Sequence, residues 1–208
     1  MKMNSGTIQF FANIAISASL MLIPNMAKEF NASNLEIGLV VGIYSFMAFL
    51  AHYIFGRASD IYGGRIFLRL GLLVCGVTFA IQILAKDYLS LFFLRALVGF
   101  SIGIFPAALM VYVYESGTGI GKFSSYGSLG WAFGSLIAGI IADYNGIFIV
   151  SAILFFLSFF ASSKFKESKK DLIDISILPL KFVKKNFHIY FPFFLRHIGA
   201  NMIWTIFP

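Results

Sequence analysis

Charged side chains are scarce in this sequence. Only 12% of the 208 residues are Asp, Glu, Lys or Arg, whereas about a quarter of an ordinary globular chain is charged. A single cysteine, Cys75, excludes an intrachain disulfide framework and a cysteine metal cluster. The three histidines, His52, His188 and His197, are too few and too scattered for a zinc site. We therefore expect neither a metal nor a cofactor.

The sequence also lacks the usual marks of ATP-driven and enzymatic chemistry. It has no Gly-x-x-x-x-Gly-Lys-Ser/Thr run, so direct drive by ATP is not expected. A membrane-embedded enzyme would need a nucleophile beside a base, or a carboxylate beside a histidine. Glu115 and His52 are the nearest candidates, and no hydrolase or metal-binding spacing joins them. We predict that the protein is not an enzyme.

Apolar side chains, by contrast, are abundant. They make up 59% of the sequence, against about 45–50% in a soluble domain, and a chain of this length has too little interior to bury them all. A lipid bilayer removes this difficulty, since its core needs about 20 apolar residues per helix. The runs are continuous rather than alternating, which favours helices over a β-barrel. They lie at 8–27, 35–55, 66–85, 88–112, 126–142 and 147–163, with a seventh candidate at 187–207.

The basic residues lie mostly on one side of the predicted membrane. With the N-terminus inside, only Lys28 and Lys86 fall on the opposite side. This bias follows the positive-inside rule and predicts a multi-pass protein of the cytoplasmic membrane with a cytoplasmic N-terminus. It also explains the net charge of +7 by topology, so no nucleic-acid partner is expected. The cytoplasmic basic residues are Lys2, Arg57, Arg65, Arg69, Lys122, Lys164, Lys166, Lys169, Lys170, Lys181, Lys184 and Lys185.

One long polar connection divides the chain. Residues 1–163 form the predicted six-helix bundle, 164–186 a basic cytoplasmic loop, and 187–208 an incomplete seventh helix. The loop mixes charged residues with apolar ones such as Leu172 and Ile175, a composition compatible with an amphipathic helix on the membrane surface. Its lysines can also contact anionic lipid.

A motif of glycines and charges lies between the second and third predicted spans. It runs from Gly56 to Arg65 as Gly-x-x-x-Asp-x-x-Gly-Gly-Arg. Gly56 lets another helix approach closely, and Gly63 with Gly64 permits a tight reversal. Asp60 is placed to accept hydrogen bonds from a helix N-terminus or an arginine at the membrane edge. The alternative interpretation is that Asp60 and Arg65 simply form a polar turn.

Part of this motif recurs later in the chain. Residues Gly139 to Gly146 read Gly-x-x-x-Asp-x-x-Gly around Asp143, at the end of the fifth predicted span. The second and fifth spans are equivalent if the six helices form two units of three. Such units must be inverted relative to each other in the membrane, and inverted repeats are common in transporters that alternate access.

An arginine lies inside the fourth predicted span. Arg95 follows Tyr88 by seven residues, about 10 Å along a helix. A charge at that depth costs about 2 kcal/mol or more unless it faces water or a partner. Arg95 therefore either meets a functional partner or reaches out to the headgroups. The glycines that follow, Gly99 and Gly103, permit close packing, and Pro106 can kink the span.

Together these features resemble the major facilitator superfamily of transporters. The motif around Asp60 is similar to the family signature between helices two and three, and the likeness in helix order covers essentially the whole chain. Two places that are usually basic in the family hold Ile61 and Gly64 here. The resemblance implies that Asp60 and Arg65 belong to a cytoplasmic charge network that holds one access state, with Glu115 as a third member.

The same resemblance implies roles for residues within the spans. Arg95 would serve proton coupling or substrate binding. The fifth span resembles the glycine-rich helix of drug and proton antiporters, although Ser135 stands where proline usually follows Gly134. Asn13 and Asn25 lie on the first helix, which lines the central cavity in the family, and each either contacts substrate or bonds to a nearby backbone carbonyl. Close packing is the simpler role of the glycines Gly99, Gly103, Gly127, Gly130, Gly134 and Gly139.

The resemblance predicts an all-α membrane protein with a six-helix bundle of major facilitator type, a 3+3 inverted repeat, followed by a partial seventh helix. Its predicted function is secondary transport of a small molecule by alternating access, coupled to a proton or ion gradient. We expect a truncated gene or fragment; the alternatives are an engineered fragment and a half-transporter that pairs with itself or a partner. The functional alternative is an inactive half-permease that acts only as a membrane-assembly partner. Substrate, direction and coupling ion stay open.

Overall fold

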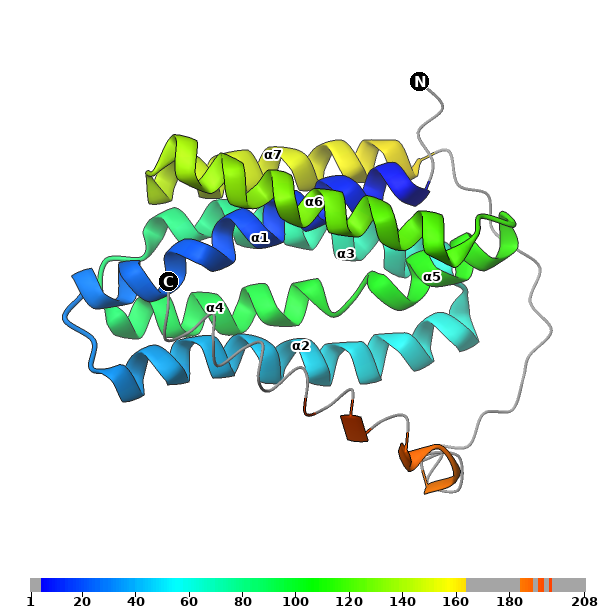
Figure 1. The fold of residues 1–208 in the computed structure, drawn as a ribbon, viewed down its shortest axis with the longest axis horizontal. Coiled ribbons are helices and arrows are strands. Elements are labelled where there is room, and N and C mark those ends of the chain that lie inside the picture. The colour runs from blue at the N-terminus through cyan, green and yellow to red at the C-terminus, as the bar shows by residue number, and fades with distance from the viewer. Residues whose placement is uncertain (1–4, 164–183, 189–190, 193–194, 196–208) are drawn as a thin grey trace. The chain divides into compact units, whose positions relative to one another are not determined.

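The computed structural model describes residues 5–163, 184–188, 191–192 and 195 (Figure 1). The chain divides into two compact units, 1–170 and 171–208. The predicted loop and the predicted seventh helix lie mostly outside the described residues, so their boundaries stay predictions. The described pieces of the second unit are short and largely helical, with the rings of Phe187 and Phe191 stacked 5.3 Å apart between centroids.

Residues 5–163 fold into α-helices joined by short turns, with no strand among them. Five helical stretches are long and apolar enough to cross a membrane, and the α4–α5 segment counts as one of them. The helix α6 is not among the five because glycine and serine lower its mean hydropathy. The elements are α1 (Ser5–Glu29), α2 (Asn34–Tyr62), α3 (Gly64–Ile81), the 3-10 turn η1 (Gln82–Leu84), α4 (Tyr88–Ile102), α5 (Pro106–Glu115), α6 (Ile120–Ile141) and α7 (Tyr144–Ser162).

Consecutive spans run antiparallel, and the helices pair in a symmetric pattern. The most extensive contacts join α1 with α6 and α2 with α4, as Figure 1 shows, and helix α7 contacts both α1 and α3. Exchanging the first three spans with the last three converts the α1–α6 pair into the α4–α2 pair and leaves α3–α7 unchanged. This pairing is the one expected of two inverted three-helix units. The predicted all-α bundle of 3+3 type is therefore confirmed.

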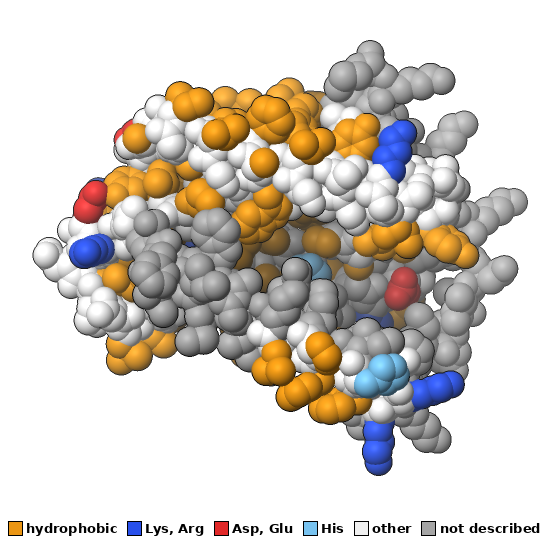
Figure 2. All heavy atoms as spheres, viewed as in Figure 1, with side chains coloured by type: hydrophobic (Ala, Val, Ile, Leu, Met, Phe, Trp, Pro, Cys, Tyr) orange, Lys and Arg blue, Asp and Glu red, His pale blue; other side chains and the backbone are white. Residues whose placement is uncertain are grey.

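The core of the bundle lies between α3, α7 and the helices that cover them. Leu68, Leu72 and Phe79 on α3 are buried with Phe155 on α7, and the rings of Phe79 and Phe155 stand 5.0 Å apart between centroids. The outer surface stays apolar, and Figure 2 shows such side chains spread over α6 and α7. An apolar exterior of this kind needs lipid or protein against it rather than water.

The fourth predicted span is a broken helix. The helix α4 ends at Ile102, and α5 begins at Pro106 after a short irregular turn. Proline has no N–H to bond back to the preceding turn and suits the first position of a new helix, so it separates the two segments. The kink expected at Pro106 is thus a full break.

The motif between the second and third spans is mostly helix rather than turn. Residues Gly56 to Tyr62 continue α2, and only Gly63 reverses the chain, with φ 96° and ψ 141°. The prediction that both glycines reverse the chain is wrong for Gly64, which begins α3 and has no positive φ. The later copy of the motif differs again, since Asp143 follows the end of α6 and caps α7 by accepting a 2.6 Å hydrogen bond from the Gly146 N–H.

We expect Gly63→Ala to lower the free energy of unfolding by about 1–3 kcal/mol, because this region of φ and ψ is open almost only to glycine. The neighbouring Gly64→Ala is the control, since its added Cβ would meet Ser59 and Ala108 at ordinary distances of 3.4 and 3.6 Å. Thermal unfolding of both variants in detergent measures the difference. Equal midpoints for the two variants would contradict the role given to Gly63.

Two pairs of helices approach so closely that only glycine fits at the contact. At Gly103, which caps the end of α4, a Cβ would lie 2.5 Å from the Cβ of Ala51 and 2.6 Å from the Ala48 carbonyl oxygen, and Gly99 within α4 abuts the Tyr44 backbone. These contacts are far below normal van der Waals separation, so α2 and α4 pack backbone to backbone.

The second close pair is α1 with α6. A Cβ at Gly130 would lie 2.6 Å from the Phe10 carbonyl oxygen, and one at Gly134 would lie 2.6 Å from that of Ile14. The structure thus places both glycines at a close contact between α1 and α6. Gly139 differs from these two, because no heavy atom of the described residues lies within 4 Å of a Cβ placed there, and its packing role stays a prediction.

The loops at the end away from Gly63 are closed by helix caps. The Ser90 N–H donates a 2.7 Å hydrogen bond to the Asp87 carboxylate at the start of α4. This backbone hydrogen bond favours the ionised carboxylate and so lowers the pKa of Asp87. Tyr144 donates a 2.7 Å hydrogen bond to Glu29, which ties α7 to α1 at the same end. These bonds fix the helix ends at the side of the bundle nearest to Arg95.

Candidate functional site

Arg95 is the largest fully buried side chain of the described residues. It lies on α4 and is 1% exposed. Helical side chains lean toward the N-terminus of their helix, and for α4 this is the end where Gln82 lies. The guanidinium nevertheless stays enclosed among the helices. Of the two outcomes expected from the sequence, direct reach to the headgroups is therefore not what the structure shows.

Two side chains from other elements, η1 and α2, hold the guanidinium. Its Nη1 donates a 3.2 Å hydrogen bond to the Gln82 side-chain oxygen in η1. Its central carbon lies 4.2 Å from the centroid of the Tyr44 ring on α2. An arginine over an aromatic face at this distance gains a cation–π attraction, which grows when water is excluded. Arg95, Gln82 and Tyr44 thus form one polar group of side chains, the Arg95 cluster.

The Arg95 cluster is under-satisfied. Within the described residues, the Nε of Arg95 and the side-chain nitrogen of Gln82 have no hydrogen-bond partner, and the structure shows no carboxylate paired with Arg95. A buried charge normally pairs with an opposite charge. An enclosed arginine with spare donors is therefore prepared to accept an anionic or strongly polar group.

Tyr44 and Gln82 are members of the site that sequence reasoning did not select. Both are visible in the sequence as polar side chains within apolar runs. Polarity alone does not show that they face Arg95, because that depends on how α2 and η1 pack against α4. The closeness of α2 and α4 at Gly99, which abuts the Tyr44 backbone, brings the Tyr44 ring to the arginine.

The two asparagines proposed for cavity contacts lie in different surroundings. Asn13 is half-buried and donates a 2.7 Å hydrogen bond to the Gln9 carbonyl oxygen within α1. A Cβ placed at Gly130 would lie 2.8 Å from the Cβ of Asn13. Asn25 is exposed near the end of α1. The structure thus gives Asn13 the backbone partner that one interpretation expected, and substrate contact by either residue stays a prediction.

The signature residues lie at the opposite end of the bundle from the Arg95 cluster. A Cβ at Gly56 would lie at an ordinary 3.7 Å from Ala107 of α5, and Asp60 is exposed in the last turn of α2. Arg65 lies in the first turn of α3 and lines a groove. The side chain of Glu115 lies outside the described part of the chain, so the expected charge network stays a prediction.

The bundle and its motifs have counterparts among known proteins. Residues 6–208 match the family profile described as Major Facilitator Superfamily. The chain belongs to the major facilitator superfamily. It is therefore a multi-pass membrane protein of a transporter family, and the family assignment inferred from its motifs is confirmed.

Members of the superfamily in several microbes are similar to this chain. An MFS-type transporter of Methanocaldococcus jannaschii is 32% identical over 127 residues, which cover 58% of this chain and 33% of the relative. The multidrug resistance protein MdtG of Proteus mirabilis is 31% identical over 160 residues, covering 70% and 40%. The MFS-type transporter YybF of Bacillus subtilis is 20% identical over 199 residues, covering 87% and 49%. The chain thus spans at most about half the length of these relatives.

Proposed function

We propose that this chain provides the N-terminal six-helix half of a secondary transporter that moves a small organic molecule across the cell membrane by alternating access. The observation that supports the proposal most directly is the enclosed, under-satisfied Arg95 within a bundle of transporter type. Transporters of this kind place their site between two halves near the membrane midplane. The second half would come from another copy, a partner chain or further residues.

The chemistry of arginine limits what Arg95 can do in such a cycle. A guanidinium does not release its proton in a protein, so it is not itself the proton carrier. It acts as a fixed positive charge that pairs with an anionic group, either on the substrate or on a carboxylate that titrates with the gradient. Pairing in one access state and release in the other would couple that group to transport.

The names of relatives support a small organic substrate. Several similar proteins are called multidrug resistance protein MdtG. We extend this to the chain as a proposal, with coupling to a proton or cation gradient. Asn13 and Asn25 on α1 are proposed to contact the substrate. The signature residues Asp60 and Arg65, with Glu115, are proposed to stabilise one access state.

The charges at the two ends of the bundle support a cytoplasmic N-terminus. The end that holds the α2–α3 and α5–α6 turns has Arg57, Arg65 and Lys122, while the other end has Lys28 and Lys86. Basic residues favour the cytoplasmic side. Protease access to an N-terminal tag in sealed inside-out and right-side-out vesicles tests this orientation. Cleavage of the tag in right-side-out vesicles, but not in inside-out vesicles, would contradict a cytoplasmic N-terminus.

Flux measured in vesicles that contain only this 208-residue chain tests the proposed transport. We expect saturable movement of at least one member of a panel of sugars, organic anions and hydrophobic cations when a proton gradient is imposed. Collapse of the gradient by an ionophore should remove it. Folded protein without flux would instead support a half-permease that acts only as an assembly partner.

A further inference from the structure

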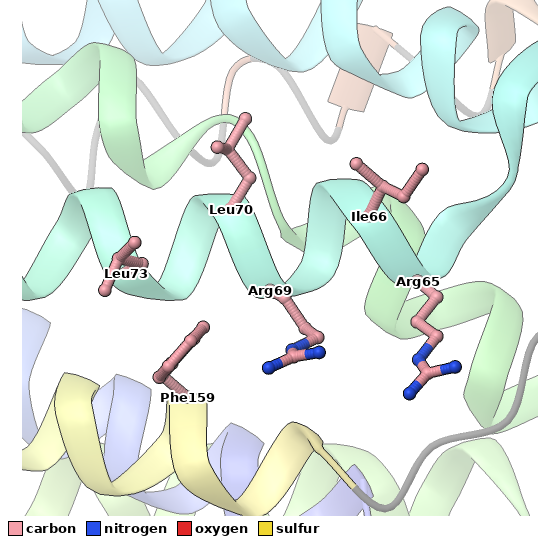
Figure 3. Close-up of a pocket in the computed structure, with 6 residues that line it drawn as sticks. All are labelled: Arg65, Ile66, Arg69, Leu70, Leu73 and Phe159. Atoms are coloured by element: carbon pink, nitrogen blue, oxygen red, sulfur yellow. The ribbon is translucent and has the colours of Figure 1, made fainter.

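A groove opens between the first half of α3 and the end of α7, away from the Arg95 cluster. Its volume is about 530 Å³. It combines two arginines with apolar walls, which is unusual for a surface formed by membrane-spanning helices. Figure 3 shows its lining residues, Arg65, Ile66, Arg69, Leu70, Leu73 and Phe159.

The two arginines turn to the same side of α3. In Figure 3 both guanidinium groups extend from α3 toward α7, and the Phe159 ring stands beside that of Arg69. The central carbon of Arg69 lies 5.2 Å from the centroid of that ring. The Nε of Arg69 is buried and has no hydrogen-bond partner in the described part of the chain. The groove is therefore lined by two guanidinium groups on the same side of α3, and the buried Nε of one of them has no partner in the described residues.

The position of Arg69 differs from that of most arginines near the end of a membrane-spanning helix. An arginine near a helix end usually extends toward water and covers apolar surface only with its stem. Arg69 instead has a buried Nε and stacks on Phe159 of α7. Arg69 is nevertheless only half-buried and lines the groove, so the exposed part of its guanidinium can face a phosphate oxygen.

An exposed apolar stripe runs along α3 on the face next to that of the arginines, and in Figure 3 Ile66 and Leu70 extend away from the two guanidinium groups. Ile66, Leu70 and Leu73 are 58%, 43% and 38% exposed, and Val77 and Ile81 extend the same face at 43% and 37%. The spacing of three or four residues keeps them on one side of the helix. From Ile66 to Ile81 the stripe is about 22 Å long, more than the roughly 15 Å from the edge to the middle of a bilayer core.

We infer that this groove binds an anionic diacyl phospholipid. The phosphate lies against the guanidinium groups of Arg65 and Arg69, and one acyl chain follows Ile66, Leu70 and Leu73 toward the middle of the membrane. Charge complementarity selects an anionic headgroup, and the depth and length of the apolar stripe select a membrane lipid over a free anion. The site goes beyond the proposed transport function, because nothing in its argument requires substrate movement.

Competition between two lipids tests the inference without any transport assay. The full 208-residue chain is reconstituted in nanodiscs of equal phosphatidylglycerol and phosphatidylcholine, and retained lipid is identified by native mass spectrometry. We expect the wild type to retain phosphatidylglycerol in preference to phosphatidylcholine. The double variant Arg65→Gln/Arg69→Gln should lower this preference about fivefold for each arginine removed. The matched control Arg57→Gln/Lys122→Gln removes two exposed charges at the same end, outside the groove, and should keep the preference.

Several results would overturn the lipid site. An equal loss in both double variants would mean general attraction of anionic lipid to a basic surface. Displacement by inorganic phosphate as readily as by lipid would mean an anion site in which the apolar stripe has no part. Loss of a dimer rather than of lipid in Arg65→Gln/Arg69→Gln would assign the groove to a second copy of the chain.

A second measurement avoids dependence on the folding of the variants. A ligand that binds only the folded state raises its thermal midpoint. Phosphatidylglycerol added to the wild-type chain in detergent should therefore raise the midpoint, while phosphatidylcholine and inorganic phosphate at the same concentration should not. Arg69→Lys, which keeps the charge, should retain most of the increase. No increase in the wild type contradicts the inference.

Discussion

Arg95→Met is expected to reduce gradient-driven flux about ten- to a hundredfold while leaving the bundle at least as stable as before. The flux falls because a charge-assisted hydrogen bond to a transported or coupling group contributes about 1.5–3 kcal/mol. The stability is kept because an enclosed guanidinium costs several kcal/mol. One hydrogen bond to Gln82 and a cation–π contact of about 2 kcal/mol with Tyr44 do not outweigh that cost.

The flux and the stability of Arg95→Met are measured separately. Vesicle flux gives the functional loss, and thermal unfolding in detergent gives the stability. Arg57→Met is the matched control, since Arg57 is an exposed residue of α2, and its flux should change little. Gln82→Leu combined with Arg95→Met removes the acceptor left behind and should raise the midpoint further. A steep fall of the midpoint in Arg95→Met alone would instead make the arginine a structural residue.

Gly99→Leu is expected to lower the free energy of unfolding by at least about 3 kcal/mol. Even a Cβ at this position would lie 2.9 Å from the Tyr44 Cα and 2.8 Å from its carbonyl carbon. Backbone atoms cannot rotate away as a flexible side chain does, so α2 and α4 must separate. Overpacking of a tight contact usually costs about 1–3 kcal/mol, and a whole leucine side chain exceeds that range.

Gly42→Leu is the matched control for the helix contact. Gly42 also lies in the interior of a helix, α2, but no described atom lies within 4 Å of a Cβ placed there. Because leucine is a better helix former than glycine, this variant should keep or slightly raise the thermal midpoint. Similar midpoints for Gly42→Leu and Gly99→Leu would show that α2 and α4 do not pack as closely as the structure has them.

The local sequence was sufficient to predict the backbone at positions where the residue type has a single physical role. Pro106 marks the break between α4 and α5 because it cannot bond back into a helix. Gly63 marks the reversal between α2 and α3 because only glycine takes its φ and ψ readily. The open surroundings of Gly139 also follow from spacing. Gly127, Gly130 and Gly134 recur at three and four residues, whereas a step of five turns Gly139 to another face of α6.

The repeated motif shows where local sequence misleads. The first Gly-x-x-x-Asp-x-x-Gly run has Asp60 within α2, before the turn, while the second has Asp143 after the end of α6, as a helix cap. The two runs share letters but not local structure. The internal symmetry is instead carried by which helices pair, and pairing depends on contacts between segments far apart in the chain.

The sequence by itself determined that the protein lies in a lipid bilayer, that it is helical, and which family it belongs to. Hydropathy and charge bias are sums over residues, and lipid acts on each span separately, so no knowledge of packing is needed. Only the tertiary structure decided which polar groups are enclosed. At about 10 Å along a helix, an arginine such as Arg95 has either lipid headgroups or protein within reach, and the choice depended on Tyr44 and Gln82 arriving from other helices to cover it.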